Sequence, residues 1–354
     1  MTQEEAIRRE NRQLRAKEVK KMGRQKSFIC IDLKSFYASV ECVERGLDPF
    51  KTNLVVADPT RSQSTICLAI TPAMKKLGVK NRCRIHEIPA GIEYITAMPR
   101  MQLYIDYSAR IYSIYLRYIS KEDIHVYSID ECFMDVTNYL SLYHMTEKEM
   151  AVELMDAVMK ETGITATAGI GTNLYLAKVA MDIVAKHVED HIGILNEISY
   201  RQQLWDHSPL SDFWRIGSRT ERKLAGYGIH TMGDIAYTSV TSEDWLYKMF
   251  GIDAELLIDH AWGLESCDIH DIKNYHTEEH SLSNGQVLMR NYSFEEAAVV
   301  VREMTDVLVL DLVSKGLITG SVTLWIAYDH RYERPSSHGT VRLTSLTNSS
   351  STIM

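Results

Sequence analysis

Short apolar runs alternate with longer amphipathic stretches along the chain, a pattern typical of a mixed α/β fold. Residues 27–35 and 54–57 are apolar runs bounded by polar residues, as buried strands are. Residues 104–118 carry tyrosine and isoleucine at three- and four-residue spacing, which predicts a helix over a sheet, with the tyrosines in the core rather than in a base-stacking platform. Further strands are predicted at 65–70, 165–171, 281–288, 321–327 and 339–344, and further helices at 38–45, 72–77, 147–161, 173–187 and 294–314.

Two adjacent carboxylates interrupt the apolar run at residues 124–136. In an extended strand Asp130 and Glu131 would point to opposite faces, so their reaching one point requires a tight turn or hairpin with both at its tip. Such a pair is costly unless a cation lies beside it, and Mg²⁺ takes one or two carboxylates together with substrate phosphates. The alternative, from these residues alone, is an exposed acidic turn that binds nothing.

A third carboxylate, Asp32, follows the first apolar run. A buried strand would deliver it to a sheet edge, which is where ligands bind in open α/β sheets. Residues 36–37 then open a helical pattern, and the free N–H groups of a helix start suit a triphosphate. This edge is therefore the predicted site.

Size, composition and charge limit the classes of protein. A chain of 354 residues with 45% apolar content should hold more than one domain. No apolar stretch is long enough to span a membrane and the first residues are charged, so we expect a cytoplasmic protein without a membrane partner. Six scattered cysteines without metal spacing indicate apolar fillers in a reducing compartment. A net charge of −8 means that a DNA-binding face must gather the basic residues.

Two motifs, in this order, resemble the Y family of translesion DNA polymerases, with the UmuC- and UvrX-like branch the most similar. Residues 31–41 read IDxxxFYASVE and residues 127–131 read YSIDE. The resemblance implies an α/β (α+β) multidomain polymerase right hand with palm, small fingers, helical thumb and a C-terminal little finger. It also implies low-fidelity, template-directed synthesis past lesions in DNA repair and the SOS response, with primer–template DNA and dNTP as partners. No second acidic group resembling a proofreading exonuclease is visible.

The resemblance also divides the chain into regions. The nine Lys and Arg of the first region, against four Glu, indicate a solvated arm, with contact to a phosphate backbone as the alternative. The last region stops before the second helix and fourth strand of the family's βαββαβ unit, so we expect an incomplete little finger of weak independent stability. The predicted regions are the arm 1–26, the palm 27–35 and 103–195, the fingers 36–102, the thumb 196–267, the linker 268–277 and the little finger 278–354.

The resemblance implies roles for four residues around two Mg²⁺ ions. Asp32 and Asp130 would bridge the two ions. Glu131 would help to hold the ion that lowers the pKa of the primer 3′-hydroxyl, and the carbonyl of Leu33 is the expected backbone ligand.

Nucleotide-binding residues follow from the same resemblance. Tyr37 falls at the position of the steric gate, whose ring excludes a ribose 2′-hydroxyl; its neighbour Phe36 is included, with core packing as the alternative. Lys75 and Lys186 are the candidates for the triphosphate. Lys34 stands where many relatives carry a second acid, and it is left out of the metal site.

Residues 214–235 resemble a helix–hairpin–helix. Gly217 would expose backbone N–H groups that hold a DNA phosphate without reading sequence, and Arg219 and Arg222 add positive charge. The alternative is a plain helical hairpin.

Two other functions stay open at this point. The incomplete little finger is compatible with a non-catalytic DNA-binding remnant of a polymerase. Palm-like sheets with similar carboxylates also serve nucleotidyl cyclases, which need no template. The sequence leaves open whether a sliding clamp or a UmuD-like accessory protein is a partner.

Overall fold

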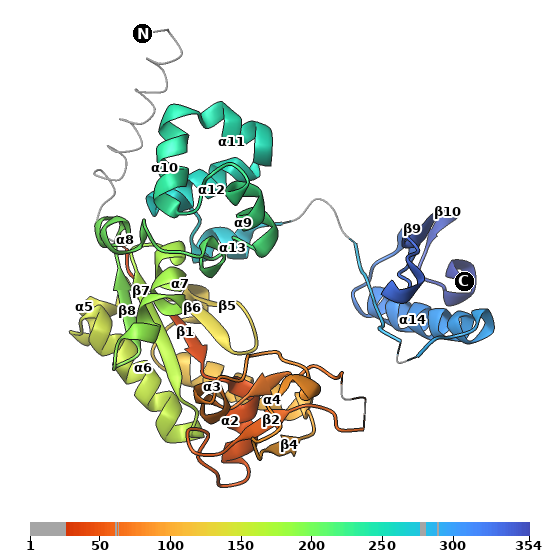
Figure 1. Ribbon diagram of the computed structural model, residues 1–354, viewed down its shortest axis with the longest axis horizontal. Coiled ribbons are helices and arrows are strands. Elements are labelled where there is room, and N and C mark those ends of the chain that lie inside the picture. The colour runs from red at the N-terminus through yellow and green to blue at the C-terminus, as the bar shows by residue number, and fades with distance from the viewer. Residues whose placement is uncertain (1–25, 61, 63, 277–280, 289) are drawn as a thin grey trace. The chain divides into compact units, whose positions relative to one another are not determined.

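The computed structural model describes residues 26–60, 62, 64–276, 281–288 and 290–354, and it divides the chain into two compact units. The first unit ends at Tyr275, and the second runs from His276 to Met354 (Figure 1). The predicted basic arm lies, apart from Lys26, outside the described residues. No helix in the described part of the chain combines the length and the apolar character of a membrane span.

A five-stranded sheet forms the centre of the first unit, in the order β5-β6-β1-β7-β8. Three of its pairings are antiparallel, and β7 and β8 are parallel. The β5–β6 hairpin confirms the predicted hairpin, with Asp130 in its turn and Glu131 as the first residue of β6. The strands are β1 Phe28–Leu33, β5 Ile124–Val126, β6 Glu131–Asp135, β7 Ala166–Gly171 and β8 Ile192–Leu195.

Different helices cover the two faces of this sheet: α4 (Met101–Tyr115) and α6 (Glu147–Thr162) on one, and α7 (Leu174–Asp182) on the other (Figure 1). Ile31 of β1 packs into the first core together with the tyrosine stripe of α4, so the prediction that this stripe is a core feature is confirmed. Cys30 packs into the second core with the apolar side of α7. Alternate residues of one strand therefore serve different cores.

Two glycines allow α7 to approach the sheet closely. A Cβ atom on Gly169 would lie 2.1 Å from the carbonyl oxygen of Ala177, and one on Gly171 would lie 2.2 Å from the Ala177 nitrogen. No side chain fits in that space, so glycine is required at both positions. The helix consequently lies low enough over the sheet for its side chains to reach the ends of β1 and β6.

The single helix predicted at residues 173–187 is wrong in its second half. The α-helix ends at Asp182, and the 3₁₀ turn η3 Val184–His187 follows, which places Lys186 on a separate turn. Residue 183 carries the change of direction, because its backbone leaves ideal helical values at φ −111°. The other short elements around the sheet are α2 Phe36–Val43, η2 Lys121–Asp123 and α5 Tyr139–Tyr143.

A smaller sheet, in the order β3-β2-β4, stands beside the central one. Of the strand predicted at 65–70, only the last two residues pair with β2, while Ile66 forms an isolated bridge with Arg84. The segment changes partner within a few residues, so no continuous ladder forms. The elements here are β2 Leu54–Val56, β3 Ala69–Ile70, α3 Pro72–Lys76, η1 Ile85–Glu87 and β4 Ile95–Ala97.

A helical segment follows the central sheet, as predicted for this part of the chain, and shares its apolar core with α7 and with Leu195 of β8. Its elements are α8 Glu197–Leu204, η4 Leu210–Asp212, α9 Ser218–Ala225, α10 Met232–Thr241, α11 Glu243–Phe250 and α12 Asp253–Trp262.

The linker expected at residues 268–277 is wrong for most of its length, because it holds helix α13 (Ile269–Asn274). The Asp268 side chain caps this helix by accepting a 3.0 Å hydrogen bond from the Asp271 N–H. Ile269 is 2% exposed and packs against the α7 side of the central sheet. A capped helix with one buried apolar side is thus part of the first unit.

The second unit has a long helix and a two-stranded antiparallel sheet. The predicted helix at 294–314 is confirmed, whereas residues 281–288 form no strand. Leu312 is the one fully buried residue among the described residues of this unit. The weak independent stability of the second unit stays a prediction, and hydrogen exchange of its backbone amides would test it. The elements are α14 Phe294–Ser314, β9 Thr319–Ile326, η5 His330–Tyr332, β10 Ser337–Thr347 and α15 Ser350–Ile353.

Candidate active site

Three carboxylates from two strands meet at one end of the central sheet. Asp32 of β1 lies directly opposite Glu131, the first residue of β6, in the antiparallel register. Directly opposite residues point to the same face of a sheet. The carbonyl oxygen of Asp130 accepts a 2.9 Å hydrogen bond from the Leu33 N–H. The structure therefore brings together all four residues that the sequence predicted as metal ligands.

The turn before β6 holds Asp130 through local hydrogen bonds. The N–H groups of Tyr127 and Ser128 both donate to the carbonyl oxygen of Glu131, at 2.9 and 3.1 Å, and close the turn. The Ser128 hydroxyl donates to the Asp130 carboxylate at 2.7 Å. This bond fixes the orientation of the carboxylate without neutralising it.

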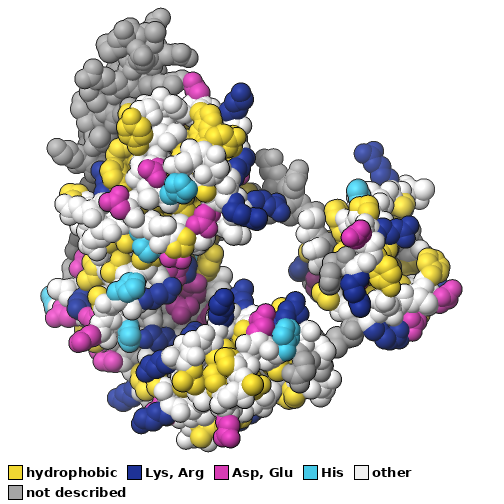
Figure 2. All heavy atoms as spheres, viewed as in Figure 1, with side chains coloured by type: hydrophobic (Ala, Val, Ile, Leu, Met, Phe, Trp, Pro, Cys, Tyr) yellow, Lys and Arg dark blue, Asp and Glu magenta, His cyan; other side chains and the backbone are white. Residues whose placement is uncertain are grey.

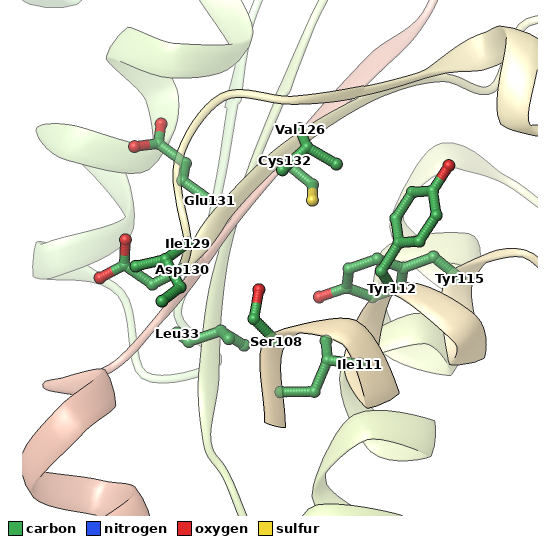
Figure 3. A pocket seen from close by; sticks show the side chains of 10 residues that line it. All are labelled: Leu33, Ser108, Ile111, Tyr112, Tyr115, Val126, Ile129, Asp130, Glu131 and Cys132. Atoms are coloured by element: carbon green, nitrogen blue, oxygen red, sulfur yellow. The ribbon is translucent and has the colours of Figure 1, made fainter. Parts of the chain in front are cut away.

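A small cavity lies behind the hairpin, and Asp130 and Glu131 contribute to its lining. It measures about 20 Å³, which is room for about one water molecule and not for a nucleotide. Figure 3 shows the carboxylates of Asp130 and Glu131 directed away from the rings of Tyr112 and Tyr115. The acids thus face the other side of the hairpin, where α7 lies.

Glu131 is buried, and its charge is balanced from α7. Its Oε1 atom lies 2.7 Å from the Lys178 ammonium, which in turn lies 2.9 Å from the Asp182 carboxylate. Burial disfavours the charged form of Lys178, but Asp182 and Glu131 outweigh it and raise its pKa. We call Glu131, Lys178 and Asp182 the inner triad. The sequence reasoning assigned no role to Lys178 or Asp182, although a lysine inside an otherwise apolar helix was the signal.

Asp32 and Asp130, here called the outer acids, have no such balance. Among the described residues no Lys, Arg or His lies within ion-pair distance of either carboxylate. Burial, followed by the charges of Asp130 and Glu131, raises the pKa of Asp32 to about 7. Lys178 partly offsets this repulsion at Asp32, but no ion pair of a described residue balances the charge of either outer acid directly.

This donor set fits a divalent cation. Carboxylate oxygens, with a backbone carbonyl beside them, are the ligands that hard cations such as Mg²⁺ take in proteins. A cation next to Asp32 would offset the repulsion that raises its pKa. The electrostatics thus fit the metal site that the resemblance implied for Asp32, Asp130 and Glu131.

Three lysines lie within electrostatic reach of Asp32 or of one another. Partial burial lowers the pKa of Lys34 to about 8, with Asp32 opposing the shift and Lys75 adding to it. Partial burial also lowers the pKa of Lys75, which responds to both Asp32 and Lys186. We call Lys34, Lys75 and Lys186 the lysine cluster; the sequence predicted two of its members and left Lys34 without a role. In the space-filling view, Lys and Arg side chains lie beside a patch of acidic ones on the first unit (Figure 2).

Tyr37 stands between the acids and the small sheet. Its ring stacks on Tyr104 of α4, with the centroids 4.5 Å apart and the planes at 17°. The Tyr104 hydroxyl donates a 2.8 Å hydrogen bond to Glu41, which is fully buried and also binds Arg100. The Tyr37 hydroxyl feels the charges of Asp130 and Arg82. The ring predicted as a gate is therefore supported from behind by a fixed partner that the sequence did not predict.

Phe36, the other predicted gate residue, lies elsewhere. Its side chain is 2% exposed and belongs to the core of the central sheet. The ring of Phe36 is therefore packed in the core, which was the alternative to a role in nucleotide binding. Phe36 is the first residue of α2, so its backbone N–H lies at the helix start. It follows Ser35, whose φ is +48°.

The predicted DNA-contact residues lie in the helical segment, apart from the acids. Gly217 is the N-cap of α9 and has no side chain to close the helix start. Arg219 and Arg222 are exposed on that helix. Gly228, at φ +77°, makes the turn toward α10. The segment thus has two helices joined by a tight turn, as a helix–hairpin–helix requires, and both arginine side chains are exposed, with Arg222 also donating to the carbonyl oxygen of Ser218.

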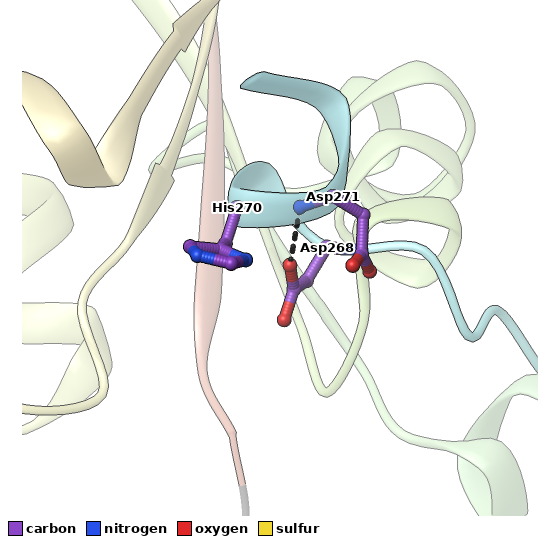
Figure 4. Close-up of side chains that lie close together, drawn as sticks. All are labelled: Asp268, His270 and Asp271. Atoms are coloured by element: carbon purple, nitrogen blue, oxygen red, sulfur yellow. Dashed lines mark hydrogen bonds between the residues drawn. The ribbon is translucent and has the colours of Figure 1, made fainter. Parts of the chain in front are cut away.

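A second group of possible ligand atoms, at the start of α13, has a structural explanation. Asp268, His270 and Asp271 lie close together (Figure 4). Asp268 accepts the N–H of Asp271 as the helix cap, and its other oxygen binds the Lys26 ammonium at 2.6 Å. Capping and one ion pair account for this carboxylate.

Comparison with known proteins places the chain in one family. The model of the impB/mucB/samB family (IMS) matches residues 31–182, which include the three acids, Tyr37 and Lys178. The "Putative UV-damage repair protein UvrX" of Bacillus subtilis (strain 168) is 33% identical over 306 residues, covering 86% of this chain and 71% of that protein. "DNA polymerase IV 2" of the same organism is 32% identical, covering 80% of this chain and 68% of its own length.

One solved structure has the same fold over nearly the whole chain. The "Y-family DNA polymerase chimera Dbh-Dpo4(243-245)-Dbh" superposes with a TM-score of 0.68 at 21% identity, covering 92% of this chain and 90% of that one. At this identity the likeness concerns the fold, including both units described above.

Proposed function

Since the chain belongs to the impB/mucB/samB group of Y-family DNA polymerases, we propose that it extends a primer on a template strand by nucleotidyl transfer, past damaged bases, with a divalent cation. One observation carries the mechanism. Asp32, Asp130 and Glu131 meet at one sheet end, and the described residues leave the first two without a counter-cation.

We propose Mg²⁺, as two ions, for this site. When bound, the ions supply charge neutralisation for the triphosphate and lower the pKa of the primer 3′-hydroxyl. Asp32 and Asp130 would be shared ligands, while Glu131 and the Leu33 carbonyl would complete the set. The inner triad holds Glu131 at the hairpin before any ligand arrives.

We propose that the lysine cluster binds the triphosphate of the incoming nucleotide. Lys34 and Lys75 interact electrostatically with Asp32, and Lys186 with Lys75, so a phosphate bound among them would meet positive charge on one side and the acids on the other. Tyr37, stacked on Tyr104, would lie under the sugar and exclude a ribose 2′-hydroxyl. The N-terminal N–H groups of α2 would add to this anion site.

The subdomain names follow as part of the proposal. The five-stranded sheet with α4, α6 and α7 would be the palm, the small sheet the fingers, the helical segment the thumb, and the second unit the little finger. Gly217, Arg219 and Arg222 would hold the DNA backbone, independent of sequence. Whether a sliding clamp or a UmuD-like subunit is a partner stays open, and a cytoplasmic location stays an expectation.

Asp130→Asn in a primer-extension assay tests the proposal. The substitution keeps the size of the side chain and the Ser128 contact but removes a ligand charge, so extension should fall by about 10²- to 10³-fold or more while DNA affinity stays near wild type. Normal extension by Asp130→Asn would eliminate the metal scheme.

Two alternatives have their own readouts in the same assay. A non-catalytic remnant would bind DNA but show no metal-dependent extension with any template. A nucleotidyl cyclase would consume its nucleotide equally with and without a labelled template. Template-dependent extension that requires a divalent cation excludes both.

A further inference from the structure

Lys178 occupies a position that the proposed chemistry does not use. It is 8% exposed, and it lies between two carboxylates, 2.7 Å from Glu131 and 2.9 Å from Asp182. The only other polar side chain on Glu131 Oε1 among the described residues is the Cys30 thiol, at 3.4 Å. The ammonium is thus the principal partner of one metal-site acid, Glu131, while the other two, Asp32 and Asp130, form no ion pair with a described residue.

Helix stability does not explain this pair. Within a helix, the order acid first and lysine four residues later is the favourable one, and here Lys178 precedes Asp182. Asp182 is also the last residue of α7, where the helix dipole disfavours negative charge. The order of the two residues makes their attraction within the helix weaker, and the dipole disfavours Asp182 at this end, so the triad is better explained by what Lys178 does for Glu131.

The two oxygens of Glu131 are used differently. Oε1 accepts from both Lys178 and Cys30, whereas the contacts of the described residues give Oε2 no hydrogen-bond donor. A carboxylate held by one oxygen presents the other in a defined direction. The same contact places a full positive charge next to the position where a divalent cation would bind, and like charges repel.

We propose that Lys178 is a resident counter-cation: it holds Glu131 and keeps the acidic site assembled without metal, and it competes with a divalent cation for that carboxylate. This rests on the proposed function, in which Glu131 is a metal ligand. Asp182 shares the ammonium and so limits how strongly Lys178 holds Glu131. Lys178 is therefore a positioning residue that sets the affinity for the metal below that of the bare acids.

The test measures Mn²⁺ binding to the full chain, without DNA, by the loss of the free-ion EPR signal. Lys178→Met should bind Mn²⁺ more tightly, by at least about tenfold, because a charge close to the metal is removed. Asp182→Asn should bind it more weakly, because Lys178 then belongs to Glu131 alone. The opposite signs matter, since damage to the fold would weaken binding in both variants.

Thermal denaturation gives a second readout. Metal-free Lys178→Met should melt below wild type, because Glu131 loses its buried partner, and added Mn²⁺ should raise its melting temperature more than it raises that of wild type. If Lys178→Met does not fold, Lys178→Gln removes the charge but keeps a hydrogen-bond donor, and the same shifts are expected.

Asp130→Asn separates this inference from the proposed function. If Asp130→Asn leaves Mn²⁺ binding unchanged, the proposed metal site itself is wrong. If Asp130→Asn weakens binding while Lys178→Met fails to tighten it, the metal site stands and the competition by Lys178 is overturned.

Discussion

The inner triad and the outer acids lie within a few residues of each other at the β5–β6 hairpin, yet their charge is balanced in different ways. Glu131 is 8% exposed and paired with a buried lysine. Asp130 is oriented only by a neutral hydroxyl, and burial and like charges raise the pKa of Asp32 to about 7. One part of the site is neutralised by the protein, and the other is left for something from outside.

This difference allows the residues that hold the site in position to be distinguished from those that act in the reaction. A buried ion pair contributes little net stability compared with apolar packing, but loss of one partner is costly because the other charge stays buried. Unpaired acids behave in the opposite way, since their removal relieves repulsion. The two groups should therefore respond oppositely in stability to substitutions that both abolish activity.

The largest expected effect comes from paired substitutions of one acid from each group. Asp32→Asn and Glu131→Gln should both lower turnover by about 10²- to 10³-fold or more. Asp32→Asn should leave the metal-free melting temperature unchanged or raised, whereas Glu131→Gln should lower the free energy of unfolding by about 1–3 kcal/mol, because Lys178 loses one of its two partners. Calorimetry beside primer extension measures both, and equal destabilisation by the two variants would remove the distinction.

Substitution of Tyr37 tests whether its ring, which is held by packing on Tyr104, determines selection of the sugar. Tyr37→Ala should raise ribonucleotide incorporation relative to deoxyribonucleotide by roughly 10- to 200-fold, the range for space opened in a pocket. Tyr37→Phe is the matched control, because it keeps the ring on Tyr104 and should keep the discrimination. Unchanged sugar selection by Tyr37→Ala would remove the gate from Tyr37.

The lysine cluster, unlike the inner triad, consists of partly or fully exposed cations. Lys75→Ala should raise the dNTP KM by about tenfold with a smaller change in kcat, because it removes an electrostatic contact made before and during the reaction. Lys76→Ala is the control on the same helix, since its ammonium lies over the Phe50 ring, 5.9 Å from the centroid. Steady-state kinetics with both variants decides, and an equal effect of the two would indicate a general surface charge.

The last expected effect is on stability alone: a pH dependence in the absence of metal. The pKa of Asp32 in the folded state, about 7, lies above the value of about 3.9 in an unfolded chain. The folded state then binds more protons between these values, so this group lowers the free energy of unfolding as the pH rises toward 7, by up to about 1.4 kcal/mol per pH unit. Melting in EDTA should show the decline in wild type and a smaller one in Asp32→Asn. A decline of the same size in Asp32→Asn would assign it to other groups.

Local pattern was enough to predict the elements that carry the acids. An apolar run ending in Asp32 and an acid pair within a β-forming run predict a strand end and a hairpin, and both are present. The helix at 294–314 also follows from periodicity within one segment. In these cases the information lies between neighbours a few residues apart.

The sequence-based prediction was wrong for short segments whose structure depends on contacts with other parts of the chain. Residues 65–70 have the composition of a strand, but the segment pairs with β2 at one end and bridges to Arg84 at the other. Residues 268–277 are polar enough for a linker, yet the cap by Asp268 and the burial of Ile269 make part of them a helix. Propensity is weak beside tertiary contacts over such short lengths.

The acids that meet at one sheet end could be identified from the chain alone, because strand direction and turn chemistry are local, and the motifs indicated the family. How the charge of these acids is balanced depends on contacts between segments that are remote in the chain. Lys178 reaches Glu131 because two glycines of β7 let α7 lie close to the sheet, and the lysine cluster gathers residues from three separate segments. Burial and distance between remote residues set electrostatic energies, and no local pattern contains them.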